Sequence, residues 1–234
     1  MLPLIINQLG LTVNNKPLLN NLCVEIVSGG ISIIMGHNGA GKSLLLRSMH
    51  GLLQPTQGTV LWANTNATDS ANRKKQAMVF QKPLMLNRSV AANIEYVLKL
   101  KGRPKVSSHQ YLASAGLENK SRQPARSLSG GEQQRLAIAR ALACEPQVIF
   151  FDEPTANLDP GATLQIESQI TEAAQQSIKV IMVTHDIAQA RRLADEVLFI
   201  SQGTVTEHTN ACDFFNQPQS AEARDYLHLS LIHI

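Results

Sequence analysis

One short segment of the chain combines the residue types that bind phosphate groups in proteins. It matches the phosphate-loop pattern in full, with Gly36, His37, Asn38, Gly39, Ala40, Gly41, Lys42 and Ser43. The glycines let the backbone fold into a nest of N–H donors, Lys42 supplies a cation for the β- and γ-phosphates, and Ser43 offers its hydroxyl to Mg²⁺. We therefore expect a phosphate-binding site here; a glycine turn formed by chance is the alternative.

Two adjacent carboxylates, Asp152 and Glu153, follow an apolar run that predicts a buried strand at residues 148–151. Neighbouring side chains of a strand point to opposite faces, so the two carboxylates can do different work where the strand ends. We expect Asp152 to hold the Mg²⁺ shell through water and Glu153 to act as general base on an attacking water. Solvated charge at a strand end is the alternative.

A third group of residues consists of Leu128, Ser129, Gly130, Gly131, Glu132 and Gln133, just before a predicted helix at residues 131–144. Small residues at a helix N-terminus leave backbone N–H groups free to bind an anion. The alternative is that Ser129 only caps the helix.

The elements expected around these residues indicate an α/β fold. Short strands at 22–27 and 58–62 suggest a β-rich start, and a buried strand at Ile31–Met35 leads through the glycine turn into a helix at 43–50. Later strands at 148–151 and 180–183 alternate with helices at 131–144, 162–174 and 187–194, and two further helices at Val90–Leu100 and 109–115 suggest a small helical region. This alternation predicts a mainly parallel sheet with its ligand site beyond the carboxyl ends of the strands.

Composition and net charge exclude several classes of function. A net charge of +3 over 234 residues is too small for a dedicated nucleic-acid binder, so no nucleic-acid partner is expected. Apolar runs fall short of the roughly 20 residues that cross a bilayer, and the N-terminus does not read as a secretory signal, so we expect a soluble chain. The widely spaced Cys23, Cys144 and Cys212 are interpreted as reduced cytosolic thiols.

Taken together, these motifs resemble the ATP-binding cassette (ABC) ATPases over residues 1–228. Gln81, Asp159 and His185 match the family's Q-loop, D-loop and switch histidine, and residues 128–133 match its signature. The resemblance implies a single domain: a RecA-like P-loop NTPase core at about 1–82 and 145–228 with an N-terminal antiparallel β face, and a small α-helical subdomain at about 83–144. It also implies ATP and Mg²⁺ as ligands.

The resemblance further implies an assembly. Two copies would pack head to tail, so that Ser129, Gly130 and Gly131 of one copy contact the ATP bound by the other. Gln81 would touch Mg²⁺ or the attacking water, His185 would contact the γ-phosphate, and Asp159 would belong to the nucleotide-contacting set.

Two positions depart from the family pattern. The aromatic residue that stacks on adenine is replaced by Val13, which offers aliphatic surface but no π-face, so we expect loose nucleotide selectivity. Ordinary strand packing of Val13 is the alternative. Leu44 stands where many relatives have threonine, and little effect is expected because Ser43 keeps the hydroxyl.

The resemblance favours the ATPase subunit of an importer on the cytoplasmic face of the inner membrane. Its partners would be a separate transmembrane permease and, indirectly, a periplasmic or surface substrate-binding protein. Residues 78–94 look like those of tungstate importers and share a core with phosphate importers, which favours an oxyanion. Import of phosphate or a polar amino acid, a soluble cassette acting on ribosomes or DNA, and a non-hydrolysing cassette remain alternatives.

The last six residues, 229–234, back-translate to a sequence that resembles a transposon-end adapter used in preparing sequencing libraries. We hypothesise that they are an artefact; an ordinary amphipathic tail is the alternative.

Overall fold

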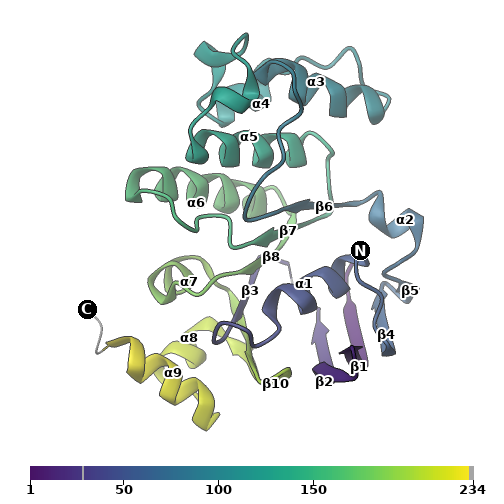
Figure 1. The fold of residues 1–234 in the computed structure, drawn as a ribbon, viewed down its shortest axis with the longest axis vertical. Helices are drawn as coiled ribbons and strands as arrows, with labels where there is room; N and C mark the ends of the chain where they lie inside the picture. The colour runs from purple at the N-terminus through teal and green to yellow at the C-terminus, as the bar shows by residue number, and fades with distance from the viewer. Residues whose placement is uncertain (28, 232–234) are drawn as a thin grey trace.

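The computed structural model describes residues 1–27 and 29–231, which form two β-sheets with helices around them (Figure 1). The smaller sheet is antiparallel, in the order β2-β1-β4-β5. Its strands are β1 (Leu4–Val13), β2 (Lys16–Ile26), β4 (Gln57–Trp62) and β5 (Thr65–Asn66). The expected β-rich start is confirmed.

The larger sheet has the order β10-β9-β3-β8-β7-β6, and every neighbouring pair is parallel except β9 and β10. Its strands are β3 (Ile31–Met35), β6 (Gln76–Val79), β7 (Val148–Asp152), β8 (Lys179–Val183), β9 (Glu196–Ser201) and β10 (Thr204–Asn210). The mainly parallel sheet is therefore confirmed. Strands β6, β9 and β10 are additions to the expected elements.

Helix α1 (Lys42–His50) lies between the two sheets and closes one hydrophobic core. Its Leu45, Leu46 and Met49 are fully buried against residues of both sheets, among them Trp62 and Phe150. The Trp62 indole also donates a hydrogen bond to the Met49 carbonyl at 2.7 Å. Because this helix is packed on two sides, the loop at its N-terminus is held firmly.

Other helices cover the opposite face of the larger sheet and extend beyond its β6 edge, where α3, α4 and α5 stack (Figure 1). They are α3 (Val90–Leu100), α4 (His109–Ser114), α5 (Gly130–Leu142), α6 (Pro160–Gln175) and α7 (Ile187–Leu193), with a short α2 (Ser70–Arg73) beside β5. The predicted helices are confirmed with ends shifted by at most two residues. The boundaries proposed for the helical subdomain stay a prediction.

Two helices complete the described chain, α8 (Ala211–Asn216) and α9 (Ala221–Leu231). The suspected artefact at 229–234 falls partly on α9, and residues 232–234 lie outside the described residues. None of the helices described is both long enough and apolar enough to span a bilayer.

Candidate nucleotide-binding site

The phosphate-loop pattern forms the turn between β3 and α1. Gly36 and Gly41 have φ angles of 145° and 105°, which residues with a side chain rarely adopt. A Cβ at Gly36 would lie 2.0 Å from the carbonyl oxygen of Ile200, and one at Gly41 would lie 2.7 Å from Cδ2 of Leu19. Glycine is therefore required at Gly36 by the close backbone of Ile200, and it is favoured at Gly41 by the positive φ.

The ammonium group of Lys42 folds back over this loop. Its Nζ donates to the carbonyl oxygens of Gly36 at 2.8 Å and His37 at 3.0 Å, and the residue is only 6% exposed. Burial lowers the pKa of Lys42 below its ordinary value, while the carboxylates of Glu153 and Asp152 oppose that shift. The poorly solvated cation is held where a phosphate group entering the loop would meet it.

Ser43 and Asp152 form a pair of oxygen-bearing side chains beside the loop that could bind a metal ion. The Ser43 hydroxyl donates to Oδ1 of Asp152 at 2.7 Å, and Arg47 lies 3.3 Å from Oδ2. The described residues contain no cluster of three or more His, Cys, Asp or Glu side chains suited to a metal. Mg²⁺ needs no such cluster, because it takes one or two protein oxygens together with phosphate oxygens and water. The oxygens of Ser43 and Asp152 therefore fit Mg²⁺ as ligands.

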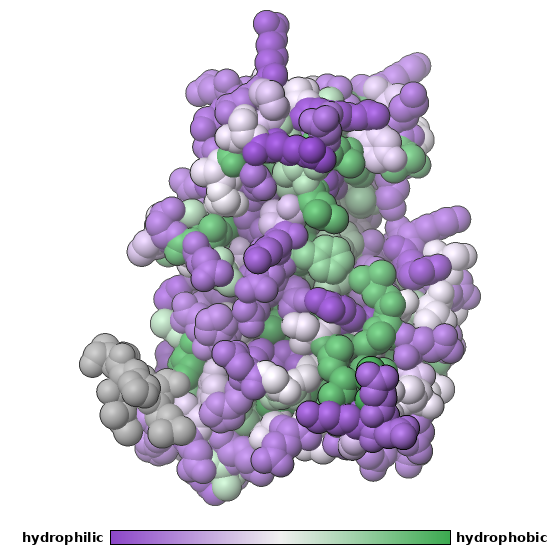
Figure 2. Space-filling view, viewed as in Figure 1, coloured by the Kyte–Doolittle hydropathy of each residue, from purple (hydrophilic) through white to green (hydrophobic). Residues whose placement is uncertain are grey.

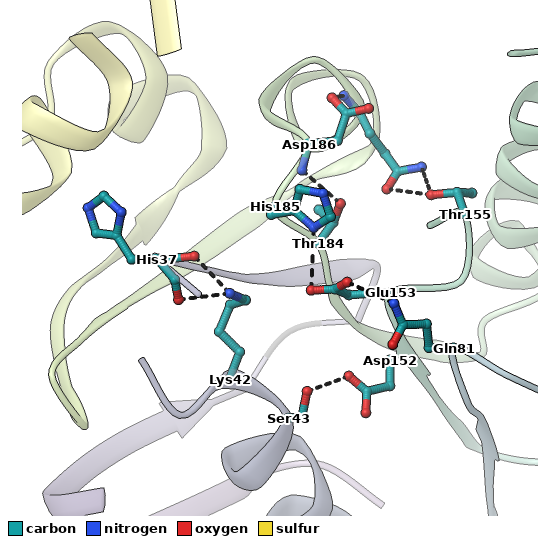
Figure 3. A network of polar contacts seen from close by, with 12 residues as sticks. His37, Lys42, Ser43, Gln81, Asp152, Glu153, Thr155, Thr184, His185 and Asp186 are labelled. Atoms are coloured by element: carbon teal, nitrogen blue, oxygen red, sulfur yellow. Dashed lines mark hydrogen bonds and ion pairs between the residues drawn. The ribbon is translucent and has the colours of Figure 1, made fainter. Parts of the chain in front are cut away.

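Glu153 lies at the centre of a convergence of three strand ends (Figure 3). Its Oε2 accepts from Nε2 of Gln81 at 3.4 Å, and its Oε1 lies 3.4 Å from Nδ1 of His185. Gln81 follows β6, Glu153 follows β7 and His185 follows β8, and these strands are neighbours in the sheet. The sheet therefore brings together three predicted site residues that lie far apart in sequence.

This cluster borders the phosphate loop directly. Glu153 lines a hollow of about 230 Å³ together with Lys42, Ser43, Asn38, Gly39, Gly41 and Leu44. The Glu153 side chain is 19% exposed and that of His185 is 55% exposed. The carboxylate is thus partly sheltered, and it faces the space that a bound phosphate chain would enter.

The structure places the predicted signature residues in a different layer, at the start of α5. Ser129 caps this helix, accepting from the backbone N–H of Glu132 at 3.4 Å while the Glu132 side chain accepts from the Ser129 N–H at 3.0 Å. Ser129 is thus the N-cap of α5, and its contact with a nucleotide stays a prediction. A Cβ at Gly130 would meet Leu158, and one at Gly131 would meet Ala162. Helix α5 packs in the core on one face of the larger sheet, and α1 packs in the core on the other face.

Two other predicted residues lie at the margins of the site. Val13 is the last residue of β1, beside the turn Asn14–Asn15. It is 46% exposed and is therefore not a buried core residue. Asp159 is exposed and caps α6, accepting from the N–H of Ala162 at 2.8 Å. Contact of either side chain with a nucleotide stays a prediction.

Two polar side chains near the site, Arg47 and Thr155, were not identified from the sequence. Arg47 approaches Asp152, and its position one helical turn after Ser43 was an available signal. Thr155 is held by the fully buried Gln189 of α7, whose Nε2 donates to the Thr155 hydroxyl at 2.9 Å. This second contact links chain segments 34 residues apart, and no local pattern indicated it.

The fold and the site define a P-loop protein with a RecA-like α/β core. Residues 19–156 match the family model described as ABC transporter. This chain therefore belongs to the ABC transporter family and is an ATPase of that family, which confirms the resemblance.

Similarity to individual proteins extends over nearly the whole chain. It is 36% identical to the phosphate import ATP-binding protein PstB of Colwellia psychrerythraea, covering 95% of this chain and 86% of PstB. It is also 36% identical to the methionine import ATP-binding protein MetN of Francisella tularensis subsp. holarctica, covering 91% of this chain and 64% of MetN, which is less than two thirds of that relative.

A solved structure shows the same fold. The cbiO1 protein of Clostridium perfringens, part of the ABC transporter complex cbiONQ, superimposes with a TM-score of 0.82 at 27% identity, covering 99% of this chain and 98% of cbiO1. The expected fold class is confirmed.

Proposed function

We propose that this chain binds and hydrolyses ATP at the hollow beside the phosphate loop. The observation that carries the proposal is the Glu153 carboxylate, which lies between Gln81 and His185 and lines the same hollow as Lys42 and Ser43. The loop N–H groups and Lys42 would bind the β- and γ-phosphates.

Glu153 would accept a proton from the attacking water, Gln81 would help to hold that water, and His185 would contact the γ-phosphate. Mg²⁺, when bound, would neutralise charge on the β- and γ-phosphates. Ser43 and Asp152, with Gln81, are the residues proposed to hold it.

We also propose that the working unit is a head-to-tail pair of copies. Ser129 and Gly131 lie at the start of α5, which packs in the core on the other face of the larger sheet from α1. This separation supports the proposal that they serve a nucleotide other than the one their own loop holds. The capping contact leaves the Ser129 hydroxyl proton available for a phosphate oxygen, because the hydroxyl accepts in that contact.

The proposed biological role is to drive import through a separate membrane permease. Relatives that cover most of this chain are named for import of phosphate and methionine. A groove of about 300 Å³ beside Gln81 fits a permease contact, since it is lined by Phe80, Pro83 and Leu84 together with α3 and α5 residues, and Leu84 is 81% exposed. Figure 2 shows hydrophobic side chains exposed between the stacked helices and the sheet. The subunit would sit peripherally on the cytoplasmic face of the membrane.

For the transported solute we propose an oxyanion such as tungstate, delivered by a periplasmic binding protein. The support is the similarity of residues 78–94 to tungstate and phosphate importers, together with the phosphate-import relative. An amino acid is the second candidate, favoured by the methionine-import relative. Uptake of radiolabelled molybdate or tungstate, phosphate and methionine by cells with and without this gene distinguishes the two.

Hydrolysis is tested by Glu153→Gln, with Glu172→Gln on the exposed side of α6 as a matched control. The amide cannot accept a proton, so phosphate release should fall by about 10²-fold or more while ATP binding is kept. The Glu172→Gln protein should match the parent. Parental turnover by Glu153→Gln would remove Glu153 from the role of general base.

A further inference from the structure

The side chain of Tyr226, on the C-terminal helix α9, reaches the nucleotide site. The Tyr226 hydroxyl donates to the backbone carbonyl oxygen of His185 at 3.2 Å. Its ring also meets the ring of His37 edge to face, with 5.0 Å between centroids. Tyr226 therefore contacts both the phosphate loop and the loop that carries the switch histidine.

The start of the helix is anchored on β10 by hydrogen bonds to Glu207. The buried carboxylate of Glu207, on β10, accepts from the backbone N–H of Gln219 at 3.0 Å and from that of Ser220 at 2.8 Å. It also accepts from the Ser220 hydroxyl at 2.9 Å. A carboxylate at this end of a helix is favourably placed because it faces unpaired N–H groups.

Packing fixes the other side of the ring. Tyr226 is 8% exposed, and its centroid lies 5.2 Å from that of Phe199 on β9. Burial, with smaller contributions from the carboxylates of Asp186 and Glu153, raises the pKa of Tyr226 to about 12. The hydroxyl therefore keeps its proton and remains a donor throughout the neutral range.

We propose that Tyr226 is a positioning residue for ATP hydrolysis, holding the His185 loop at a set distance from the phosphate loop. The inference rests on the proposed function, in which His185 contacts the γ-phosphate. Tyr226 acts through two separable parts: the hydroxyl fixes the backbone of His185, and the ring supports His37.

The two parts predict different kinetic effects. Tyr226→Phe removes the hydroxyl and keeps the ring, so kcat should fall by about threefold to tenfold, as expected for loss of one hydrogen bond, while KM for ATP stays within about twofold. Tyr226→Leu also removes the ring contact with His37, so KM should rise as well. Tyr96→Phe is the matched control, because Tyr96 lies on α3 and its ring instead packs under Arg88.

Histidine ring signals in NMR spectra provide a readout that does not depend on turnover. Replacing the aromatic ring in Tyr226→Leu should shift the His37 signal through loss of the ring current, and Tyr226→Phe should leave it nearly unchanged. The His109 signal, on α4, should be unaffected in both variants. An unchanged chemical shift of His37 in Tyr226→Leu would show that the two rings are not in contact.

Failure of the inference is distinct from failure of the proposed function. If the parent lacks Glu153-dependent hydrolysis, the proposed function fails while the His37 shift still reports the contact. If the parent hydrolyses ATP and a folded Tyr226→Phe, checked by its unfolding midpoint, keeps parental kcat, the positioning role is wrong.

Discussion

Mixing two inactive variants tests whether the site is completed by a second copy. Lys42→Ala removes the cation that is held 2.8 and 3.0 Å from two loop carbonyls, and Ser129→Arg fills the space at the start of α5. In a head-to-tail pair of one variant each, both defects fall in the same composite site. The other site is then wholly intact.

The expected gain follows from counting sites. Equal amounts that pair at random give about half mixed dimers, each with one intact site of two, so roughly a quarter of parental sites is restored. Ser129→Arg also removes the capping hydroxyl from α5, at a cost of about 1 kcal/mol. Its unfolding midpoint should therefore be compared with that of Ser129→Ala, which loses the same cap without adding bulk.

The structure provides a sharp control for this assay. Lys42 and Glu153 line the same hollow of one copy, so mixing Lys42→Ala with Glu153→Gln damages both sites of every mixed dimer. That mixture should recover no phosphate release, although its Glu153→Gln site still binds ATP. The assay measures phosphate release and the number of trapped nucleotides per dimer, since strict cooperation between two sites would suppress turnover but not trapping.

Two results would refute the reasoning. The first is a mixture of Lys42→Ala and Ser129→Arg that neither turns over nor traps one ATP per dimer. The second is an equal gain of phosphate release in the control mixture, which would show that the restored activity does not come from a composite site.

Two further predictions concern base contact and stability. Val13→Tyr should strengthen the binding of both ATP and GTP by about 1 kcal/mol, because every base has a π-face. The parent should bind the two nucleotides with affinities within roughly tenfold of each other. Competition titrations that show a strong ATP preference in the parent and no gain in affinity in the variant would remove Val13 from the nucleotide site. For Glu196, burial alone would raise the pKa, but hydrogen bonds from His208 and Ser32 and the charge and hydrogen bond of Lys179 lower it to about 2. The pKa of Glu196 in the folded protein thus lies below its ordinary value of 4.5. Glu196 therefore contributes up to about 3 kcal/mol to the free energy of unfolding above pH 4.5, and this contribution is lost as the pH falls toward 2. Denaturant titrations from pH 6 to 3 should show this loss in the parent and a smaller one in Glu196→Gln; equal slopes would contradict the assignment.

The amino-acid sequence alone determined the locally encoded parts of this protein. Residues 36–43 specify the phosphate loop because their glycines and lysine act within one turn, and the apolar run at Ile31–Met35 and the helix at Val90–Leu100 were predicted with their observed ends. Asp152 and Glu153 were placed correctly at the end of a strand for the same reason. Each of these features depends on backbone geometry and on neighbours close in the chain.

Tertiary structure decided which distant residues share the site. Glu153 meets Gln81 across 72 residues because β6 and β7 pair in parallel, and a short apolar run does not by itself reveal which strand it will join. The strands and helices after residue 194 were missed for that reason, and so was Tyr226. Its place beside His37 and His185 exists only because α9 folds back and is anchored on β10 by the buried Glu207 carboxylate, a long-range contact that leaves no periodic pattern in the sequence.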